Sequence, residues 1–261
     1  SKKVSAEGSL LNVSPGTVYD NVGNSTVCPG NQTVKIDKTA PSCVSSGGSS
    51  NWTNSNVKLL GKCSDNGSGC KSNAERVIER EGNWSSLSPG TVTDKAGNTA
   101  TCPSNQTAKI DKTAPSCVSS GGSNSWSKSN ITLLGTCSDS VSDCKGNVTK
   151  MMSNDGTWNN VSPGTVYDNA GNSTTCPANQ TAKIDKTAPS CVSSGGSSNW
   201  TKDSRTLKGT CSDSGSGCVK GSASDRTYDN SGNVTWLIDW TGSWTNRSPG
   251  TVYDAAGNST T

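Results

Sequence analysis

Cysteine and aspartate recur along this chain at regular intervals, and both residue types can form bonds or bind metal ions. The 261 residues include twelve cysteines and no histidine, so there is no imidazole to act as a general base or to activate a nucleophile. An even, periodic cysteine set in a polar chain is typical of a disulfide framework, and disulfides persist in oxidising compartments. We therefore expect an extracellular or cell-surface protein that is not an enzyme.

Zinc binding by four thiolates is the other chemistry that such a set could serve. Structural zinc sites usually contain short Cys-x2-Cys knuckles, and this sequence has none. Disulfides are therefore favoured. The cysteines expected to form them are Cys43, Cys63, Cys70, Cys102, Cys117, Cys137, Cys144, Cys176, Cys191 and Cys211.

The cysteines recur because the whole chain is repetitive. Ile-Asp-Lys-Thr-Ala-Pro-Ser-Cys begins at Ile36, Ile110 and Ile184, a step of about 74 residues, and such a period indicates an array of modules. We predict the C-terminal part of a preceding repeat in 1–35, complete repeats in 36–109 and 110–183, and a last repeat in 184–261. The last repeat has a 12-residue insertion and lacks its final strand. Both ends of the chain resemble cuts through a longer array.

The local sequence predicts strands and tight turns. The segments 56–63 and 130–137 alternate in aliphatic and β-branched residues, and Asp-x-Ala-Gly-Asn is a turn signature between two strands. The segment 75–81 has helical propensity, but its counterpart around 148–155 has no helical stripe, so a strand is expected in both. The few large apolar residues of each repeat predict small cores that need covalent support.

Three runs of residues carry a resemblance to a known family. The runs are Thr-Val-Thr-Asp-Lys-Ala-Gly-Asn-Thr-Ala from Thr91, Lys-Ile-Asp-Lys-Thr-Ala-Pro from Lys109, and Cys-Ser-Asp-Ser-Gly-Ser-Gly from Cys211. They resemble the tandem bacterial immunoglobulin-like domains of large surface proteins and adhesins. The resemblance implies an all-β fold, a tandem array of small disulfide-stapled Ig-like β-sandwich repeats of about 74 residues.

The resemblance also implies a disulfide pairing. In an immunoglobulin-like sandwich the first strand runs antiparallel to the second, which suggests Cys43 with Cys63 and, at the same end of the sandwich, Cys70 with Cys102. An alternative pairs Cys63 with Cys70, and Cys28 with Cys43. In an extended array Cys28 and Cys43 would lie about a domain length apart, roughly 30 Å at ~3.3 Å per strand residue. This distance is beyond the ~7 Å between Cα atoms that a disulfide can span. The first scheme is favoured, although connectivity does not follow from sequence.

Under the favoured pairing, Cys28 and Cys218 have no partner in this chain. Either the chain is a window on a longer polypeptide, or Cys218 of one copy bonds Cys28 of the next. In the second case the amino-terminal segment would supply the last strand to the incomplete repeat by strand addition. The segment 13–20 duplicates the strand at 248–254, which favours the window.

The aspartates recur with the repeat, so they are expected to serve turns and linkers. The alternative is calcium at the module junctions, held by Asp37, Asp111 and Asp185 with loop carbonyls. The resemblance to adhesin stalks supports calcium, whereas Lys38, Lys112 and Lys186 beside those acids weaken it. Otherwise we expect no cofactor.

Charge and hydropathy exclude other classes of partner. The balance is 23 basic against 20 acidic residues without a basic run, so no nucleic-acid partner is expected. No apolar segment is long enough to span a membrane. The expected partners are neighbouring repeats or copies of this chain, and a host or neighbour-cell glycan or protein.

Two further sets of residues could serve recognition or modification. Trp236 and Trp240 are unique to the insertion and could stack on a sugar or protein, although a larger local core explains them equally well. Sequons matter only where the glycosylating enzyme exists, and a chain so rich in Asn, Ser and Thr produces many by chance. They include Asn24, Asn51, Asn83, Asn105, Asn130, Asn172 and Asn199.

These observations favour a structural extracellular protein that forms a rod, stalk or fibre on a cell surface. Two alternatives stay open. One is an adhesin that binds glycan or protein through the insertion of the last repeat. The other is a self-assembling filament subunit joined head to tail by strand addition.

Overall fold

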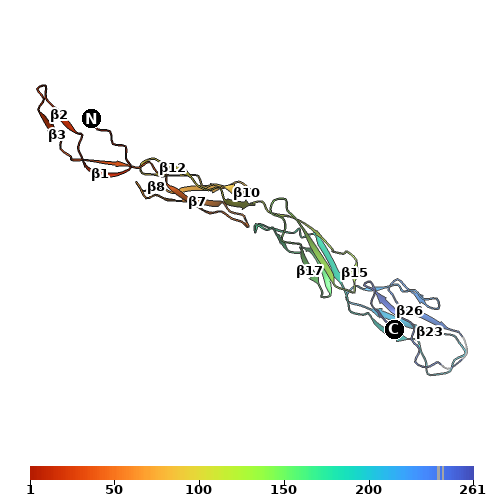
Figure 1. Cartoon of the computed structure of the whole chain (residues 1–261). Helices are drawn as coiled ribbons and strands as arrows, with labels where there is room; N and C mark the ends of the chain where they lie inside the picture. The colour runs from red at the N-terminus through yellow and green to blue at the C-terminus, as the bar shows by residue number, and fades with distance from the viewer. Residues whose placement is uncertain (240–241, 243) are drawn as a thin grey trace. The chain divides into compact units, whose positions relative to one another are not determined.

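All regular structure in the computed structural model is β-strand (Figure 1). The structure describes residues 1–239, 242 and 244–261. The expected all-β class is confirmed. The chain forms two compact units, residues 1–113 with 169–172, and residues 114–168 with 173–261. No helix among the described residues is long and apolar enough to cross a membrane.

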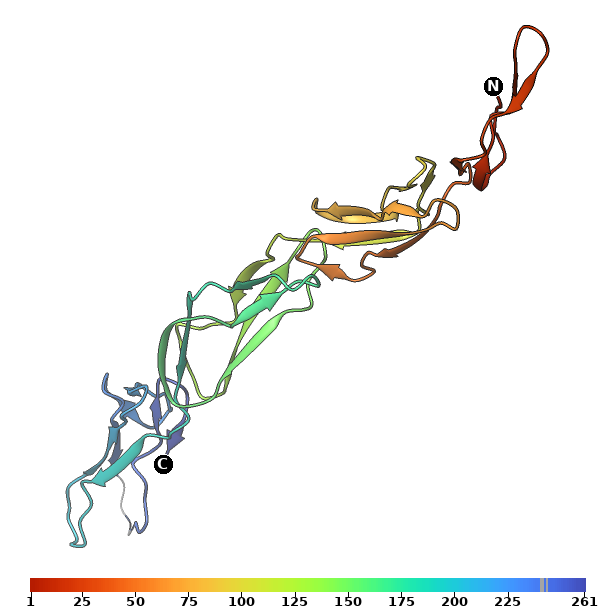
Figure 2. The same cartoon turned by 90° about the vertical axis from the view of Figure 1, so that its left-hand side faces the viewer.

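The first unit contains an amino-terminal segment and one complete set of strands, which we call the first repeat. In the amino-terminal segment β1 (Gly8–Val13) pairs with β4 (Gln32–Ile36), and β2 (Thr17–Tyr19) pairs with β3 (Ser25–Val27), the hairpin drawn in red in Figure 2. The first repeat has three small sheets. They are β5 (Ser42–Gly47), β7 (Val57–Ser64) and β9 (Ala74–Ile78); β10 (Gly82–Leu87), β13 (Gln106–Ile110) and β6 (Trp52–Thr53); and β12 (Thr99–Thr101), β11 (Thr91–Asp94) and β8 (Cys70–Ser72).

The core of the first repeat has two parts. Strand β7 alternates buried and exposed residues along its whole length, as a strand with one face on the core must. At one end its buried face packs in a cluster of aliphatic residues, Val57, Leu59, Ile78, Ala108 and Ile110, flanked by Trp84 and Leu87. At the other end the cluster is largely sulfur, formed by Cys63, Ala74, Val92 and Cys102 with Cys43, Cys70 and Ala100. Four of the seven residues of this second cluster are therefore cysteines.

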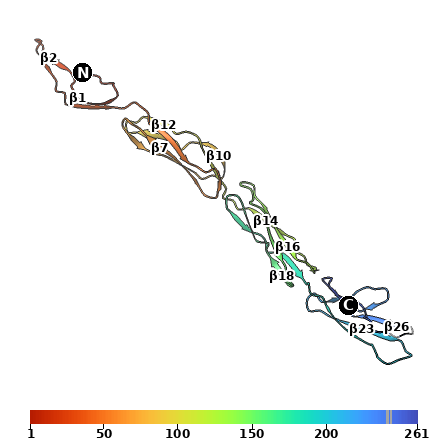
Figure 3. The same cartoon turned by 60° about the horizontal axis from the view of Figure 1, so that its bottom comes forward.

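The second unit contains two repeats. In the second repeat, β14 and β16 lie side by side (Figure 3), and Ile131, Leu133, Met152, Ala182 and Ile184 form a cluster like that of the first repeat. Its strands are β14 (Ser116–Ser120), β16 (Ile131–Ser138) and β17 (Val148–Met152); β15 (Trp126–Ser127), β21 (Gln180–Ile184) and β18 (Gly156–Val161); and β19 (Thr165–Tyr167) with β20 (Ser173–Thr175). Strands β9 and β17 confirm the strand expected at 75–81 and 148–155.

The third repeat contains the counterpart of the sheet formed by β5, β7 and β9, and the insertion adds a strand to it. Strand β25 from the insertion pairs with β26, and the hydroxyl of Tyr228 donates to the carbonyl of Thr251 at 3.0 Å. Among the described residues no strand corresponds to β13 or β21. The strands are β22 (Ser190–Ser194), β23 (Arg205–Ser212), β26 (Val234–Ile238) and β25 (Thr227–Tyr228); and β24 (Cys218–Val219), β27 (Val252–Asp254) and β28 (Ser259–Thr260).

Candidate functional site: disulfides and junction aspartates

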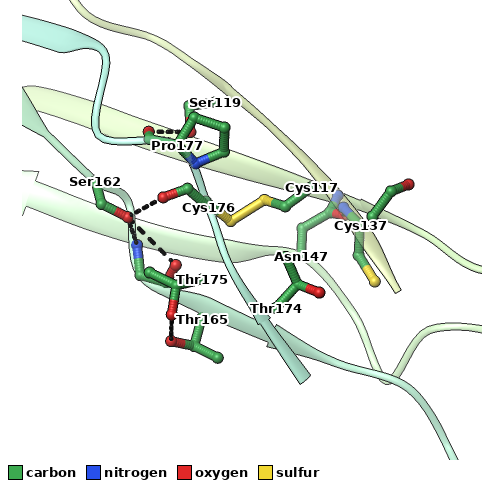
Figure 4. The surroundings of a disulfide bond; sticks show 12 residues. Cys117, Ser119, Cys137, Asn147, Ser162, Thr165, Thr174, Thr175, Cys176 and Pro177 are labelled. Atoms are coloured by element: carbon green, nitrogen blue, oxygen red, sulfur yellow. Dashed lines mark hydrogen bonds between the residues drawn. A yellow bond between two sulfur atoms is a disulfide. The ribbon is translucent and has the colours of Figure 1, made fainter. Parts of the chain in front are cut away.

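One type of disulfide joins the first strand of a repeat to the residue that follows its β11–β12 or β19–β20 hairpin. Cys43 bonds Cys102 and Cys117 bonds Cys176, each with a sequence separation of 59 and Cα atoms 5.0 and 5.1 Å apart. In Figure 4 the hydroxyl of Ser162 donates to the carbonyl of Cys176 at 2.7 Å, and that of Ser119 donates to the carbonyl of Pro177. Both ends of this bond are therefore fixed by hydrogen bonds as well as by the sulfur bridge.

A glycine makes room for this disulfide. A Cβ atom built on Gly61 would lie 2.5 Å from the sulfur of Cys102 and 3.0 Å from that of Cys43. Gly135 has the same relation to Cys176 and Cys117, at 2.6 and 3.2 Å. The contacts of 2.5 and 2.6 Å are closer than side-chain carbon atoms approach a sulfur, so glycine is required beside this disulfide.

The second type of disulfide closes a short loop. Cys63 bonds Cys70, Cys137 bonds Cys144 and Cys211 bonds Cys218, each with a sequence separation of 7. An asparagine supports the first cysteine of each pair, as when the side-chain oxygen of Asn73 accepts from the amide of Cys63 at 3.0 Å. The loop between the cysteines carries one of the recurring aspartates, such as Asp65.

The pairing implied by the family resemblance is wrong. Cys43 does lie opposite Cys63 in the β5–β7 register, but the two do not bond. The amide of Cys102 donates to the carbonyl of Gly90 at 2.9 Å, and the sulfur of Cys102 bonds that of Cys43 in β5. Of the alternative scheme, Cys63 with Cys70 is confirmed. The Cys28 to Cys43 type is wrong, because the partner of Cys43 comes from the end of its own repeat.

The corrected pairing also changes which cysteines are unpaired. Cys28 is free, as expected, but the second free thiol is Cys191 and not Cys218. Cys191 corresponds to Cys43 and Cys117, and Cys28 corresponds to Cys102 and Cys176. Burial raises the pKa of the Cys191 thiol above its ordinary value.

Three aspartates converge where the amino-terminal segment joins the first repeat. Carboxylate oxygens of Asp37, Asp65 and Asp94 lie within 4.8 Å of one another. The amide of Ser68 donates to Asp37 Oδ2 at 2.5 Å, and the amide of Gly69 donates to Asp65 Oδ2 at 2.7 Å. The hydrogen bonds from Ser68, followed by that from the Thr39 amide, hold the pKa of Asp37 below its ordinary value despite partial desolvation.

The third repeat has a second triad of the same kind, formed by Asp185, Asp213 and Asp254. Asp254 accepts the backbone and side-chain amides of Asn258 at 2.8 and 2.7 Å, and Asn258 also donates to the carbonyl of Asp185. Burial raises the pKa of Asp185, but hydrogen bonds from Ser216 and Thr187 outweigh it, so the net shift is downward.

The donor chemistry of these triads fits a hard divalent cation. Carboxylate oxygens are the ligands that calcium prefers, and no cationic side chain within the described residues forms an ion pair with either triad. A Cβ atom on Gly67 would lie 2.5 Å from Asp37 Oδ2, and one on Gly215 would lie 2.4 Å from Asp185 Oδ2, so the loop glycines keep the carboxylates accessible to the backbone. Of the three acids singled out from the sequence, Asp37 and Asp185 lie in these triads. Asp111 is fully buried and accepts from the amide of Thr113.

The sequence identified one acid per junction and missed that two others join it. Asp65 and Asp94 recur as regularly as Asp37, but recurrence alone does not bring the three together. The signal was the pairing Asp94–Asn98 in the Asp-x-Ala-Gly-Asn turn, where Gly97 adopts a φ of 96°. This turn buries Asp94 and points its carboxylate at the junction.

The structure places Trp236 in the core. It is 8% exposed, and the guanidinium of Arg226 lies 3.9 Å from the centre of its ring. This burial contradicts a ligand-binding role for Trp236, because neither a sugar nor a protein could stack on the covered ring. Trp240 lies outside the described residues.

The sequons differ in how their side chains are used. Asn24 and Asn172 employ the side-chain amide that would carry a glycan, donating to Asp20 Oδ2 at 2.7 Å and to the carbonyl of Asp111 at 2.9 Å. The amide of Asn130 donates to the sulfur of Met151. Four sequon asparagines are exposed, and their side-chain amides donate no hydrogen bond of this kind: Asn51, Asn83, Asn105 and Asn199.

Comparisons with protein-family models and with the sequences of curated proteins give no match. Among solved structures, the chain is similar to the tetra-tandem repeat in the extending region of a large adhesion protein. The match covers 93% of this chain and 77% of that one, with 15% sequence identity and a TM-score of 0.26. A TM-score this low does not establish a shared fold.

Proposed function

We propose that this chain is part of an extracellular structural protein, a stalk or fibre made of tandem immunoglobulin-like repeats that bear tension along the chain. The single observation that supports this role is the long disulfide of the first and second repeats. Two sheets face each other across each small core, in agreement with an immunoglobulin-like sandwich. Abundant disulfides favour a location outside the cytoplasm.

The long disulfide changes the path that force takes through a repeat. The chain enters the first repeat just before Cys43 and leaves it through β13, just after Cys102. The bond between these cysteines removes residues 44–101 from the load path, because tension passes through the sulfur bridge. Cys117 and Cys176 do the same in the second repeat. A stalk built this way keeps its length even when the noncovalent structure of a repeat opens.

Single-molecule stretching of the chain tests this role. With the disulfides intact, we expect no extension from residues 44–101 or 118–175. Reduction should add about 200 Å per repeat, because each loop of 59 residues can extend by roughly 3.3–3.6 Å per residue. Equal extension in the oxidised and reduced states would contradict the proposal. A variant with Cys63→Ser and Cys70→Ser is the matched control, since it removes the short-loop disulfide and leaves the Cys43–Cys102 bond in place.

We also propose that the aspartate triads bind calcium and stiffen the junctions. Asp94 and Asp254 are 0% and 1% exposed, and each lies in a group of three carboxylates within 4.8 Å. Burying like charges so close together is costly without a counter-charge. A bound divalent cation would supply that charge, with Asp37, Asp65 and Asp94 as ligands at one junction and Asp185, Asp213 and Asp254 at the other.

Thermal unfolding with calcium and with a chelator tests the calcium proposal. Calcium should raise the unfolding temperature, because a ligand that binds only the folded state stabilises it. Asp94→Asn should reduce this response. Asp20→Asn is the matched control, since Asp20 forms the same turn with Asn24 without belonging to either triad. An unchanged unfolding temperature at millimolar calcium would exclude calcium binding at these sites.

A further inference from the structure

The first repeat has an open flank, formed where outer strands of two of its sheets meet. Strand β9 is an outer strand of the sheet β5–β7–β9, and β10 is an outer strand of the sheet β10–β13–β6. A cavity of about 370 Å³ lies between these two strands, and its lining includes Arg76, Ile78, Arg80, Trp84 and Leu87. An outer strand leaves alternate backbone amides and carbonyls unpaired. The flank therefore offers backbone partners beside a cavity that can hold a side chain.

The third repeat covers the same edge with a strand of its own. Arg76 of β9 and Trp236 of β26 are equivalent, because each lies opposite the corresponding leucine of the central strand. In the third repeat β25 pairs with the outer edge of β26, at Thr235 and Val234. No strand among the described residues pairs with the outer edge of β9. The third repeat therefore shows how an added strand fits this flank.

Two side chains of the added segment bind backbone carbonyls of the third repeat. The Nε of Arg226 donates to the carbonyl of Pro249 at 2.7 Å, and the hydroxyl of Tyr228 donates to the carbonyl of Thr251 at 3.0 Å. These carbonyls belong to the Ser-Pro-Gly-Thr segment, which begins at Ser88 in the first repeat. A segment that followed the path of β25 along β9 would therefore meet the same two acceptors.

The flank of the first repeat is cationic where that of the third is aromatic. In the third repeat the guanidinium of Arg226 lies 3.9 Å from the centre of the Trp236 ring, whereas the first repeat has Arg76 in place of this tryptophan. The guanidinium of Arg80 lies 5.9 Å from the centre of the Trp84 ring. Neither Arg76 nor Arg80 forms an ion pair within the described part of the chain. A second arginine would be repelled here, and a carboxylate would be attracted.

The acidic side chains around these arginines are bound to other groups. Glu75 forms an ion pair with Lys58 at 2.6 Å. Glu79 accepts a side-chain amide at 3.4 Å, and Glu81 accepts a backbone amide of the following linker at 2.6 Å. The two guanidinium groups are therefore available to a ligand.

We propose that this flank binds an extended acidic peptide of another protein, which adds as a strand to β9 in the register that β25 has on β26. Continued by one residue, this register places the position of Arg226 opposite Arg76, where a carboxylate meets Arg76 and Arg80. The residue two positions earlier lies opposite Ile78, beside the cavity, so an aliphatic side chain suits it. Backbone pairing supplies affinity, and alternate side chains supply specificity.

Apolar surface on the flank supports the addition of a strand. Val77, in the middle of β9, is 44% exposed, and it lies on the other face of the strand from Ile78. An added strand would cover part of this side chain on one face and fill the cavity on the other. The binding site is separate from the proposed structural role, because a repeat without it would still bear tension through its long disulfide.

The second repeat has the same outer strand without the same charge. Strand β17 is the counterpart of β9 and is also at the edge of its sheet. Lys150, Ser153 and Asn154 have the positions of residues 76, 79 and 80, so one cation replaces two. An acidic peptide should therefore prefer the first repeat, and the second repeat supplies an internal control.

A synthetic peptide tests the proposal on the full oxidised chain. The probe has the sequence of residues 222–230 with Ser224→Leu and Arg226→Glu, so it combines the path of β25 with the chemistry of the flank. We expect it to slow hydrogen exchange of the β9 amides and to leave those of β17 unchanged. The same peptide with Arg226 retained should bind at least about tenfold more weakly in titration calorimetry, a difference of about 1.4 kcal/mol.

Charge reversal in the chain locates the site. Arg76→Glu should weaken binding of the probe at least about tenfold, and Lys150→Glu at the equivalent position of the second repeat should leave it unchanged. Both residues are exposed, so both variants should keep the fold, and an unchanged unfolding temperature checks this.

Three results would overturn the proposal. They are the absence of β9 protection at millimolar probe, equal binding of the glutamate and arginine peptides, and equal losses from the two charge reversals. Polygalacturonate serves as a second probe. If it bound in an Arg76-dependent manner while the peptide did not bind, the arginines would belong to a glycan site and the peptide would be excluded. In each case stretching still decides the structural role.

Discussion

The first and third repeats share their first sheet and differ in the second: among the described residues the third repeat has no strand that corresponds to β6, β10 or β13, and it has the additional strand β25. In the first repeat β13 fills the space between β10 and β6, and Cys102 bonds Cys43. In the third repeat the equivalent of Cys43, Cys191, is free, and Trp200, the equivalent of Trp52, is 86% exposed. The first sheet forms in both repeats, as β5, β7 and β9 in the first and as β22, β23 and β26 in the third. The comparison indicates that the last strand and its cysteine close the core but do not determine the first sheet.

The largest effect should come from breaking the long disulfide of the complete repeat. Cys102→Ser should lower the stability of the first repeat by about 2–5 kcal/mol, because the bond closes a long loop and fills the core beside Val92. Hydrogen exchange of the β7 amides measures this locally. Cys28→Ser at the equivalent free position should change the same amides by less than about 0.5 kcal/mol. Equal effects would show that the two cysteines have the same environment.

The next effect compares the same strand position in two environments. Ile110 is 0% exposed in β13, whereas Ile36 in β4 is half-buried. Ile110→Ala should cost about 2–5 kcal/mol, and Ile36→Ala should cost less than half as much. Denaturant unfolding of single variants, followed by local hydrogen exchange, gives both values. If Ile36→Ala proved the more costly, β4 would already be buried by an unseen partner.

A smaller effect concerns acid. The pKa of Asp37 is held below its ordinary value of 3.8, chiefly by hydrogen bonds from Ser68. A depressed folded-state pKa stabilises the fold above the ordinary value, and this contribution is lost as pH falls through the folded pKa. The junction should therefore weaken below about pH 4, and Asp37→Asn should remove that pH dependence. Carboxyl chemical shifts followed by NMR from pH 6 to 2 would show it, and an Asp37 midpoint above 3.8 would contradict it.

The smallest effect concerns the reactivity of a single thiol. Burial raises the pKa of Cys191, so less of it is thiolate near neutral pH. Its alkylation by iodoacetamide should be slower than that of a free cysteine in a peptide, and should rise more steeply between pH 8 and 10. Mass spectrometry of the digested chain measures both rates. Reaction as fast as the peptide would mean that the thiol is not covered.

The repeat, the all-β class and the presence of disulfides could be predicted from the order of residues alone. A step of about 74 residues, a chain without helical stripes and an even cysteine set are properties of the order of residues, and they hold in any packing of the modules. The strands at 56–63 and 130–137 were also predicted correctly, because local alternation defines them without distant contacts.

The identity of the bonded cysteines and of the acids that lie together depends on the packing of segments that are far apart in the sequence. Cys43 has both Cys63 and Cys102 as neighbours in the fold, and the choice depends on how the chain turns after β12, which no local pattern encodes. The gathering of Asp37, Asp65 and Asp94 likewise needs three segments far apart in sequence. Trp236 could have faced solvent or the core, and Arg226 and the extra strand β25 place it inside. Long-range contacts of this kind depend on the packing of whole elements, and single residues do not reveal them.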